Sequence, residues 1–460
     1  MRTIKITAIL ALISISISCS SDSKPSEEGE NYKISSINPK FGYEGDEITF
    51  NMTTTVTTNA SVEINYGNQR AVISEVNGNT IRHIVPNHPN VSKTLIIDNQ
   101  IINIEGLYGL DKFIDCANCK EKALPPSNSD EVDSAISSIY KKDNKIYLIK
   151  SSRNSNYNYK TSLLETDLNF NLLRETTLFD KLPISKAIFE SNIFVISNEN
   201  GVFSFDLNGQ KIWSYETTIT SGAAGSTYIG FVKNTMLYYN SNYYVIKKAQ
   251  THTNVPLEII KLNHSGQLLS TIYIPNPNPN SPLYSANIIT QVNNKIIVTT
   301  RLFNYGDGYV VIDINDNILR NTYNQIELLG INNFVEGSSI YETRYAGGPN
   351  SDPIFELVKM TLDGDNYFQL DWTKPNYAGH IIKYNSKYLS IKRDKILIFN
   401  DNNFVNPTEF LATTENFSYL TINGAKVFNN DLYLFGNRTI ENAYDYFSLI
   451  GRYDLNHIIN

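Results

Sequence analysis

The sequence predicts an all-β protein, and three observations support this prediction. Tyr (30 residues) and Phe (21) far outnumber Met (4), a composition that favours strands over helices. Stretches such as Val202–Glu216 alternate apolar and polar residues on either side of an Asx-Gly turn, as a β-hairpin does. Similar turns recur at intervals of 38 to 57 residues. We therefore expect a small N-terminal β-sandwich followed by a seven-bladed β-propeller.

Length and charge limit the classes of function. A chain of 460 residues is long enough for two or three domains, and 41% hydrophobic with 18% charged residues indicates a globular protein. The formal net charge is -7, and no cluster of basic residues could follow a phosphate backbone. We therefore expect no nucleic-acid partner.

The N-terminus has the form of a secretion signal. Met1–Ser18 contains two basic residues and then the apolar run Ile6–Ile17, which is too short for a spanning helix. The following Cys19 makes this segment resemble a bacterial lipobox, although Ser16 stands where Leu is usual. The resemblance implies a lipoprotein signal peptide (1–18), lipidation of Cys19 and a polar, flexible tether (19–31). The alternative is an ordinary signal peptide cut near Ser18.

Residues 32–106 are predicted to form the sandwich. The string from Ile34 to Phe50 places a strand, a Pro turn, two glycines and an alternating strand in succession. It resembles the opening of an IPT/TIG immunoglobulin-like domain. Domains of that family are spacers or binding modules, and we expect a spacer here.

The segment 107–133 is predicted to be a linker that contains the only CxxC motif. In an oxidising compartment, Cys116 and Cys119 are expected to form a disulfide with each other. A redox-active pair would need a thioredoxin-like context, haem attachment would normally need a His after the second Cys, and zinc would need two more ligands. The six His residues show no ligand spacing. We expect no metal and no cofactor.

Residues 134–460 are predicted to form the propeller. Each recurring turn follows an apolar strand, and seven turns predict seven blades. They begin at Asp167, Asp206, Asn263, Asp313, Asp363, Asn400 (with Asp401) and Asp454. Such turns can be mistaken for calcium loops, but most Asx-rich turns satisfy their own backbone.

Val202–Glu216 also resembles the blades of quinoprotein-like propellers, in which an Asp, a Gly and a Trp mark the outer hairpin. Here Gly209 follows Asp206 by three positions, and Trp213 is peculiar to this blade. The resemblance concerns the fold and not the cofactor. No GxSxG, HExxH, P-loop or dinucleotide motif is present, so we name no catalytic residue. A pair of acids for glycoside hydrolysis stays open, because the fold sets its spacing.

Aromatic clusters are the candidates for ligand stacking. Rings that lie in or near loop-like stretches could stack on sugars or contact a protein, and the alternative is that they fill the space between blades. Tyr157 with Tyr159 is one such pair. The residues that we choose are Tyr243, Tyr244, Tyr345, Trp372 and Tyr377.

Two further expectations concern the start of the propeller. Asp133-Ser134-Ala135 matches a short pattern for O-glycosylation in Bacteroidetes surface proteins, which makes Ser134 a candidate site. After Asp454 too few residues remain for a complete outer strand, and an open sheet edge must be covered. We therefore expect part of Leu124–Ile139 to pair with the sheet of Tyr446–Leu455.

A lipobox-like N-terminus followed by an IPT/TIG-like domain and a propeller resembles the surface lipoproteins of the Bacteroidetes group. That resemblance implies a non-catalytic binding or scaffold protein, lipid-anchored at the outer membrane and facing the cell exterior, with the periplasmic face left open. A glycan or an outer-membrane protein would be its partner. The alternative is a secreted propeller enzyme, a glycosidase or lyase, that acts on polysaccharide.

Overall fold

The computed structural model describes residues 31–38, 41–86, 92–104, 107–110, 119–124, 131–220, 232–252, 255–302, 306–323, 334–345, 355–392, 395–411, 420–439 and 446–459. Within these ranges the chain is almost entirely β, with one short helix, α1 (Leu455–Ile459). No helix in this part of the chain has the length and apolar character needed to cross a membrane.

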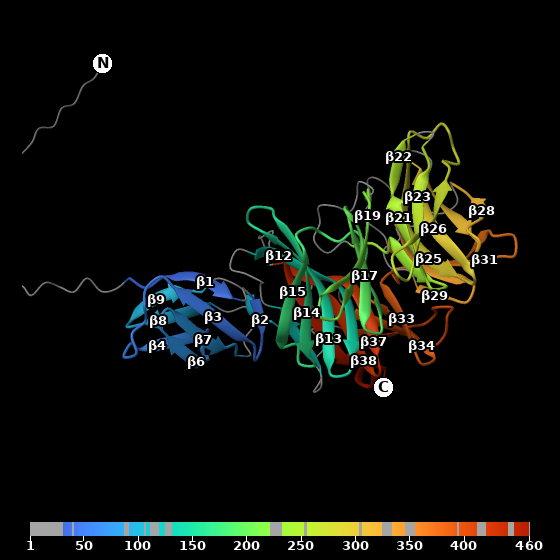
Figure 1. The fold of residues 1–460 in the computed structure, drawn as a ribbon. Helices are drawn as coiled ribbons and strands as arrows, with labels where there is room; N and C mark the ends of the chain where they lie inside the picture. The colour runs from blue at the N-terminus through green and yellow to red at the C-terminus, as the bar shows by residue number, and fades with distance from the viewer. Residues whose placement is uncertain are drawn as a thin grey trace, which may run out of the picture.

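The N-terminal strands form two four-stranded sheets around one apolar core, which is the predicted sandwich (Figure 1). In β3 the side chains of Ile48, Phe50 and Met52 are buried, and the residues between them are partly exposed, as the period of a strand requires. One sheet has the order β1 (Ile34–Asn38), β3 (Glu47–Met52), β7 (Thr80–Ile84), β6 (Val72–Asn77). The other has the order β5 (Gln69–Arg70), β4 (Val62–Tyr66), β8 (Lys93–Ile97), β9 (Gln100–Asn103).

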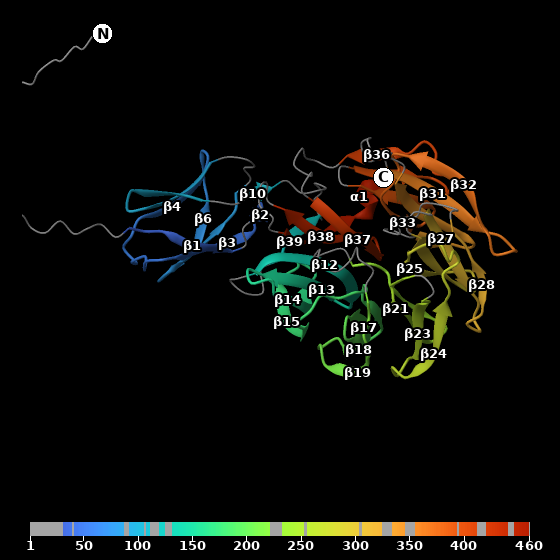
Figure 2. The same cartoon turned by 90° about the horizontal axis from the view of Figure 1, so that it is seen from above.

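Seven further sheets form a ring, with the sandwich at one side of it (Figure 2). We number these blades in chain order, and in each blade the first strand is the innermost. Blade 1 comprises β12 (Glu131–Lys142), β13 (Lys145–Asn154), β14 (Tyr159–Asp167) and β15 (Leu172–Phe179). Blade 2 comprises β16 (Ile188–Glu190), β17 (Ile193–Asn198), β18 (Gly201–Asp206) and β19 (Lys211–Glu216). Blade 3 comprises β20 (Met236–Tyr239), β21 (Asn242–Lys248), β23 (Leu257–Asn263) and β24 (Leu268–Ile274).

Blades 4 to 6 repeat the pattern, and blade 4 gains β22 (Gln250–His252) as a fifth strand from the chain of blade 3. Blade 4 comprises β25 (Leu283–Val292), β26 (Lys295–Leu302), β27 (Gly306–Ile312) and β28 (Ile318–Asn321). Blade 5 comprises β29 (Phe334–Glu336), β30 (Ser339–Tyr345), β31 (Phe355–Leu362) and β32 (Phe368–Pro375). Blade 6 comprises β33 (His380–Tyr384), β34 (Lys387–Ile391), β35 (Lys395–Phe399) and β36 (Thr408–Leu411).

Apolar side chains between neighbouring blades hold the ring together. Each adjacent pair of blades shares a buried cluster, and seven such clusters can be traced through the described ranges. Between blades 2 and 3, for example, Val195 and Val202 pack with Tyr243 and Val245. Because each blade buries both of its faces, its central strands are apolar along nearly their whole length.

The recurring Asx turns connect the third and fourth strands of the blades, or begin where a fourth strand would follow. In blade 2, Asp206 Oδ1 accepts hydrogen bonds from the backbone N–H groups of Asn208 and Gln210, both at 2.8 Å. The same two-bond pattern occurs at Asp167, Asn263, Asp313 and Asp363. These carboxylates and amides therefore satisfy their own turns, as expected for Asx turns.

A strand from before the ring completes the last blade. Blade 7 comprises β37 (Leu420–Phe428), β38 (Asp431–Thr439) and β39 (Tyr446–Asp454), and its fourth strand is β11 (Lys120–Ala123). In β11, Lys120 lies opposite Arg452 and Ala123 opposite Leu449. The predicted pairing of N- and C-terminal segments is confirmed.

The position of the closing strand differs from the prediction. It ends one residue before the predicted range, from which only Leu124 contributes, by donating its N–H to Ser448 O at 3.0 Å. Residues from Glu131 onward already form β12, the inner strand of blade 1. The predicted linker 107–133 thus contains β11, the start of β12 and β10 (Leu107–Leu110), which pairs with β2 (Phe41–Tyr43).

Among the cysteines, Cys119 lies beside β11, where it is buried and disulfide-bonded. Its predicted partner Cys116 and the predicted lipidation site Cys19 lie outside the described residues.

Candidate functional site

A large cavity opens on one end of the ring, above blades 1 to 4. This end carries the loops between second and third strands and the connections from one blade to the next. The cavity has a volume of about 1170 Å³. Most of its lining residues are polar. They come mainly from segments of blades 1 and 2, with single residues from blades 3 and 4: Glu131, Ser152–Asn154, Tyr157–Lys160, Asp180–Ile184, Glu199, Asn200, Thr218–Thr220, Lys233, Thr235, Ala249 and Ala286.

One wall is a tight loop that presents an aromatic ring. Asn154 Oδ1 accepts hydrogen bonds from the N–H groups of Asn156 (3.0 Å) and Asn158 (2.9 Å), which fixes the loop between β13 and β14. Tyr157, at the tip of this loop, has a φ of 61°. Positive φ is uncommon for a bulky residue and points to a role for its position. The Tyr157 side chain is 70% exposed.

Arg153 supports the Tyr157 ring from behind. Its guanidinium carbon lies 4.8 Å from the ring centroid, within the range of a cation–π contact. The guanidinium also pairs with the buried carboxylate of Asp133 in β12. Tyr157 is therefore an exposed ring on a loop whose backbone and whose supporting side chain are both fixed.

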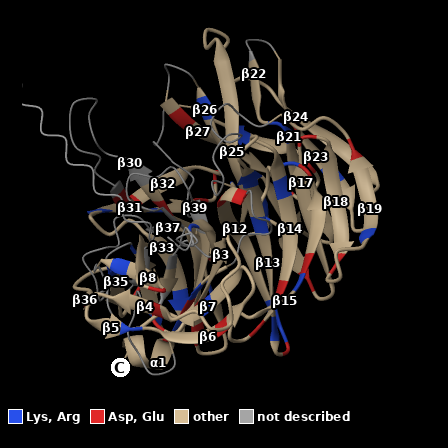
Figure 3. Ribbon diagram, turned by 90° about the vertical axis from the view of Figure 1, so that its left-hand side faces the viewer, with Lys and Arg blue, Asp and Glu red and all other residues tan. Residues whose placement is uncertain are grey.

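Most charges around the cavity are paired. Lys160 pairs with Glu175 at 3.1 Å, and Lys181 pairs with Glu199. Glu131 pairs with Lys150 at 2.8 Å, with both side chains buried. Acidic and basic residues are likewise interspersed along the strands of the molecule (Figure 3). The charges of the cavity wall thus largely cancel, apart from those of Asp180 and Lys233, which form no ion pair with a described residue.

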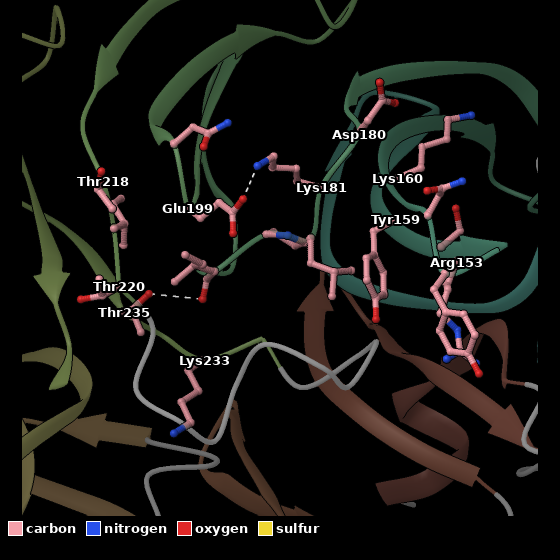
Figure 4. Close-up of a pocket in the computed structure, with 18 of the residues that line it drawn as sticks. Arg153, Tyr159, Lys160, Asp180, Lys181, Glu199, Thr218, Thr220, Lys233 and Thr235 are labelled. Carbon is pink, nitrogen blue, oxygen red and sulfur yellow. Dashed lines mark hydrogen bonds and ion pairs between the residues drawn. The ribbon is translucent and has the colours of Figure 1, made fainter. Parts of the chain in front are cut away.

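The opposite wall carries hydroxyl groups. Figure 4 shows Arg153, Tyr159 and Lys160 on one side of the cavity, and Thr218 and Thr220 on the other. Thr235 donates its hydroxyl to Ile184 O at 3.4 Å, which joins blade 3 to the connection before blade 2. The cavity thus offers an aromatic ring, hydroxyl groups and amides. These groups can bind a polyhydroxylated molecule.

Across the described residues, no group of three or more His, Cys, Asp or Glu side chains is placed to hold a metal ion.

The aromatic residues chosen from the sequence lie elsewhere. Tyr243 and Tyr244 are 0% and 1% exposed, so the choice of these two as stacking residues was wrong. They belong to the second strand of blade 3, where one ring packs toward blade 2 and the other toward blade 4. Burial and Glu190 raise the pKa of the Tyr243 hydroxyl, which donates to Glu190 Oε2 at 3.1 Å.

Trp372 and Tyr377 are half-buried and pack against the aromatic cluster between blades 5 and 6. The side chain of Tyr345 lies outside the described residues. Tyr243, Tyr244, Trp372 and Tyr377 do not line the cavity. Tyr157 and Tyr159, by contrast, do line it. The sequence marks that pair only as one aromatic cluster among several, and the Asn-rich loop Asn154–Asn158 was the signal that could have ranked it first.

Ser134 is also not available as a modification site in the folded chain. It lies in β12 with 2% exposure, and its Oγ accepts a hydrogen bond from the N–H of Ser448 at 3.0 Å. A glycan there would have to separate blade 1 from blade 7, so the structure argues against the predicted O-glycosylation.

Comparisons with known proteins add solved structures only, because no protein-family model and no curated protein sequence matches the chain. The WD40 domain of Pan2 from Neurospora crassa is 11% identical, with 69% of this chain and 89% of that chain covered, at a TM-score of 0.45. The polysaccharide lyase Uly1 is 8% identical, with 69% and 90% covered, at 0.42. An auxiliary nutrient binding protein from Bacteroides thetaiotaomicron is 11% identical, with 92% and 98% covered, at 0.29.

Proposed function

We propose that this protein is a non-catalytic glycan-binding module whose binding surface is the cavity beside Tyr157. The observation that carries the proposal is the Tyr157 ring itself, 70% exposed and held at a positive φ by its own loop. An exposed ring with this support offers a flat apolar face that loses little conformational entropy on binding a sugar.

The lining of the cavity indicates the class of glycan. Its volume of about 1170 Å³ exceeds the usual size of pockets for small metabolites, which favours an oligosaccharide. Its paired charges and its threonine hydroxyls favour neutral, polyhydroxylated sugar units over strongly charged ones.

The cellular position is part of the same proposal. Lipidation of Cys19 would anchor the chain at the outer membrane, and the polar stretch 19–31 would hold the sandwich and the propeller away from the surface. Cys19→Ser is therefore expected to move the protein from the membrane fraction to the soluble fraction. Continued sedimentation with membranes, together with palmitate labelling, would contradict the anchor.

A polysaccharide array probed with the full chain tests the binding function. We expect a hit among neutral polysaccharides, and Tyr157→Ala should weaken its binding about tenfold, the equivalent of ~1.4 kcal/mol for one stacked ring. Tyr273→Ala is the matched control, because Tyr273 is 58% exposed in β24 and does not line the cavity. Array binding that Tyr157→Ala leaves unchanged would contradict the proposal.

The same hits distinguish binding from catalysis. Each bound polysaccharide is incubated with the protein and then assayed for new reducing ends and for unsaturated products. A binding module leaves the polysaccharide intact, whereas turnover would establish the alternative, a propeller glycosidase or lyase.

A further inference from the structure

Three basic residues lie in or beside the inner strands of the ring. Lys186 lies two residues before the start of β16 in blade 2, His380 begins β33 in blade 6, and Lys426 lies in β37 of blade 7. All three belong to the innermost part of their blades, which surrounds the axis of a propeller.

Hydrogen bonds bring Lys186 and His380 to β37, the strand that carries Lys426. Lys186 Nζ donates to Asn423 O of blade 7 at 3.1 Å. Blade 1 lies between blades 2 and 7, so this bond joins two blades that are not neighbours in the ring. His380 Nε2 lies 2.8 Å from Ile422 O, on the same inner strand. The three groups therefore surround the stretch of β37 from Ile422 to Lys426.

The cluster lacks a compensating negative charge among the described residues. No ion pair joins Lys186 or Lys426 to a described carboxylate, whereas buried Lys150 has Glu131 at 2.8 Å. Burial and the charge of Lys426 lower the pKa of Lys186 to about 8. Burial and the charge of Lys186 lower the pKa of His380 to about 4, a shift that the Ile422 carbonyl partly opposes. Enclosed positive charge without a partner is costly.

Solvent still reaches the cluster. Lys186 is half-buried and Lys426 is exposed, although protein surrounds both, as expected of side chains that line a channel. A ligand can therefore approach without unfolding a blade. The backbone of Lys186 also bonds to that of Lys233, which lines the Tyr157 cavity, with Lys186 N–H donating to Lys233 O at 3.1 Å. Lys186 thus lies next to the lining of the cavity.

We propose that the channel of the ring binds one anionic group, with the ammonium groups of Lys186 and Lys426 as its ligands. The chemistry is that of an oxyanion, either a free phosphate or sulfate or the carboxylate of an acidic sugar. Such a group would accept charge-assisted hydrogen bonds from both lysines and relieve their mutual repulsion. Anion binding in the channel is independent of glycan binding at Tyr157.

Thermal unfolding of the full chain tests the site. Melting temperatures are measured at pH 7 in sodium chloride and, at matched ionic strength, in phosphate, sulfate or glucuronate, with glucose as the uncharged comparison. We expect at least one of the oxyanions to raise the melting temperature saturably above the chloride value, and glucose not to do so. The anion that does so distinguishes a free inorganic ion from a sugar carboxylate.

Lys186→Met separates a ligand role from a structural one. If Lys186 carries an unpaired charge that binds an anion, the variant should melt at a higher temperature than the wild type in chloride. It should also lose the oxyanion increment, the rise in melting temperature that oxyanions cause. A lysine needed for its bond to Asn423 would instead lower the melting temperature when replaced. Lys211→Met, at an exposed position in β19, should change neither value.

Two results would overturn the proposal. One is equal melting of the wild type in chloride and in all three oxyanions. The other is a full oxyanion increment in Lys186→Met, or, should that variant not fold, in Lys426→Met at its exposed position. Tyr157→Ala should keep the increment, so failure of glycan binding and failure of anion binding are separate outcomes.

Discussion

Buried His83 shows how a single side chain can make the sandwich sensitive to pH. It is 0% exposed, lies 4.7 Å from the Phe50 ring centroid and shares a 2.8 Å hydrogen bond with the Tyr66 hydroxyl. Burial lowers the pKa of His83 to about 4, so the folded sandwich holds the neutral imidazole.

We therefore predict that the sandwich loses stability as the pH falls from 6.5 to 4. In this window the unfolded chain binds a proton that the folded chain does not, and the loss approaches about 2–3 kcal/mol near pH 4, at ~1.4 kcal/mol per pKa unit. This loss of stability is measured by hydrogen exchange of peptides from β3 and β7, corrected for the pH dependence of the intrinsic exchange rates.

His83→Phe is the test variant, because it keeps a ring beside Phe50 and cannot titrate. The sandwich of this variant should be less stable at pH 7, since the Tyr66 hydroxyl loses a partner. Its stability should not change between pH 6.5 and 4. Exchange in blade 6 should keep its own dependence on pH, because His380 also has a lowered pKa. A sandwich that stays equally sensitive to pH in His83→Phe would contradict the assignment.

At the scale of elements, the Asx turns join neighbouring blades as well as neighbouring strands. Gly209 has a φ of +81°, and a Cβ there would lie 2.6 Å from Thr176 of the preceding blade. Gly266 has a φ of +79°, and a Cβ there would lie 2.3 Å from the Trp213 ring. The single Trp of blade 2 is therefore a packing surface for the Asx turn of blade 3.

Gly266→Ala should destabilise the propeller by about 1–3 kcal/mol, because it adds both a strained φ and a clash with Trp213. Tryptophan fluorescence during urea unfolding measures this, since both tryptophans belong to the propeller. Gly337→Ala is the matched control: φ is again positive (+59°), but nothing lies within 4 Å of the added carbon. Equal losses in the two variants would show that the Trp213 contact contributes nothing.

The elements also show what the sequence can predict. Asx turns and apolar strands follow from contiguous residues, so seven turns predicted seven blades. The closing strand cannot be predicted in this way, because Lys120–Ala123 is short, has three charged residues out of four and becomes a strand only beside β39. Likewise, Tyr243 and Tyr157 are both aromatic residues beside Asn, and only the packing of blades buries one and exposes the other.

At the scale of the whole molecule, β11 determines how the ring stays closed. A chain that begins at residue 111 keeps β11 and lacks the sandwich, whereas one that begins at residue 129 lacks both. We predict that the shorter chain melts several degrees lower than the longer one. It loses the backbone pairing with β39 and the packing of Cys119, Ala123 and Leu124 against the two neighbouring clusters. Equal melting temperatures would show that the ring is stable with an open edge.

The pairing of β11 with β39 also affects the order in which the chain folds. Glu121 and Tyr453, which bond across it, are 332 residues apart. Contacts of such separation form late, because the intervening chain must be ordered before they form. During synthesis, β11 is made before all the other strands of the ring, and its partner strand β39 is made last. The charged residues of β11, Lys120, Glu121 and Lys122, keep the unpaired segment soluble and oppose its pairing with other chains. The first strand of the ring to be synthesised is thus the last to pair.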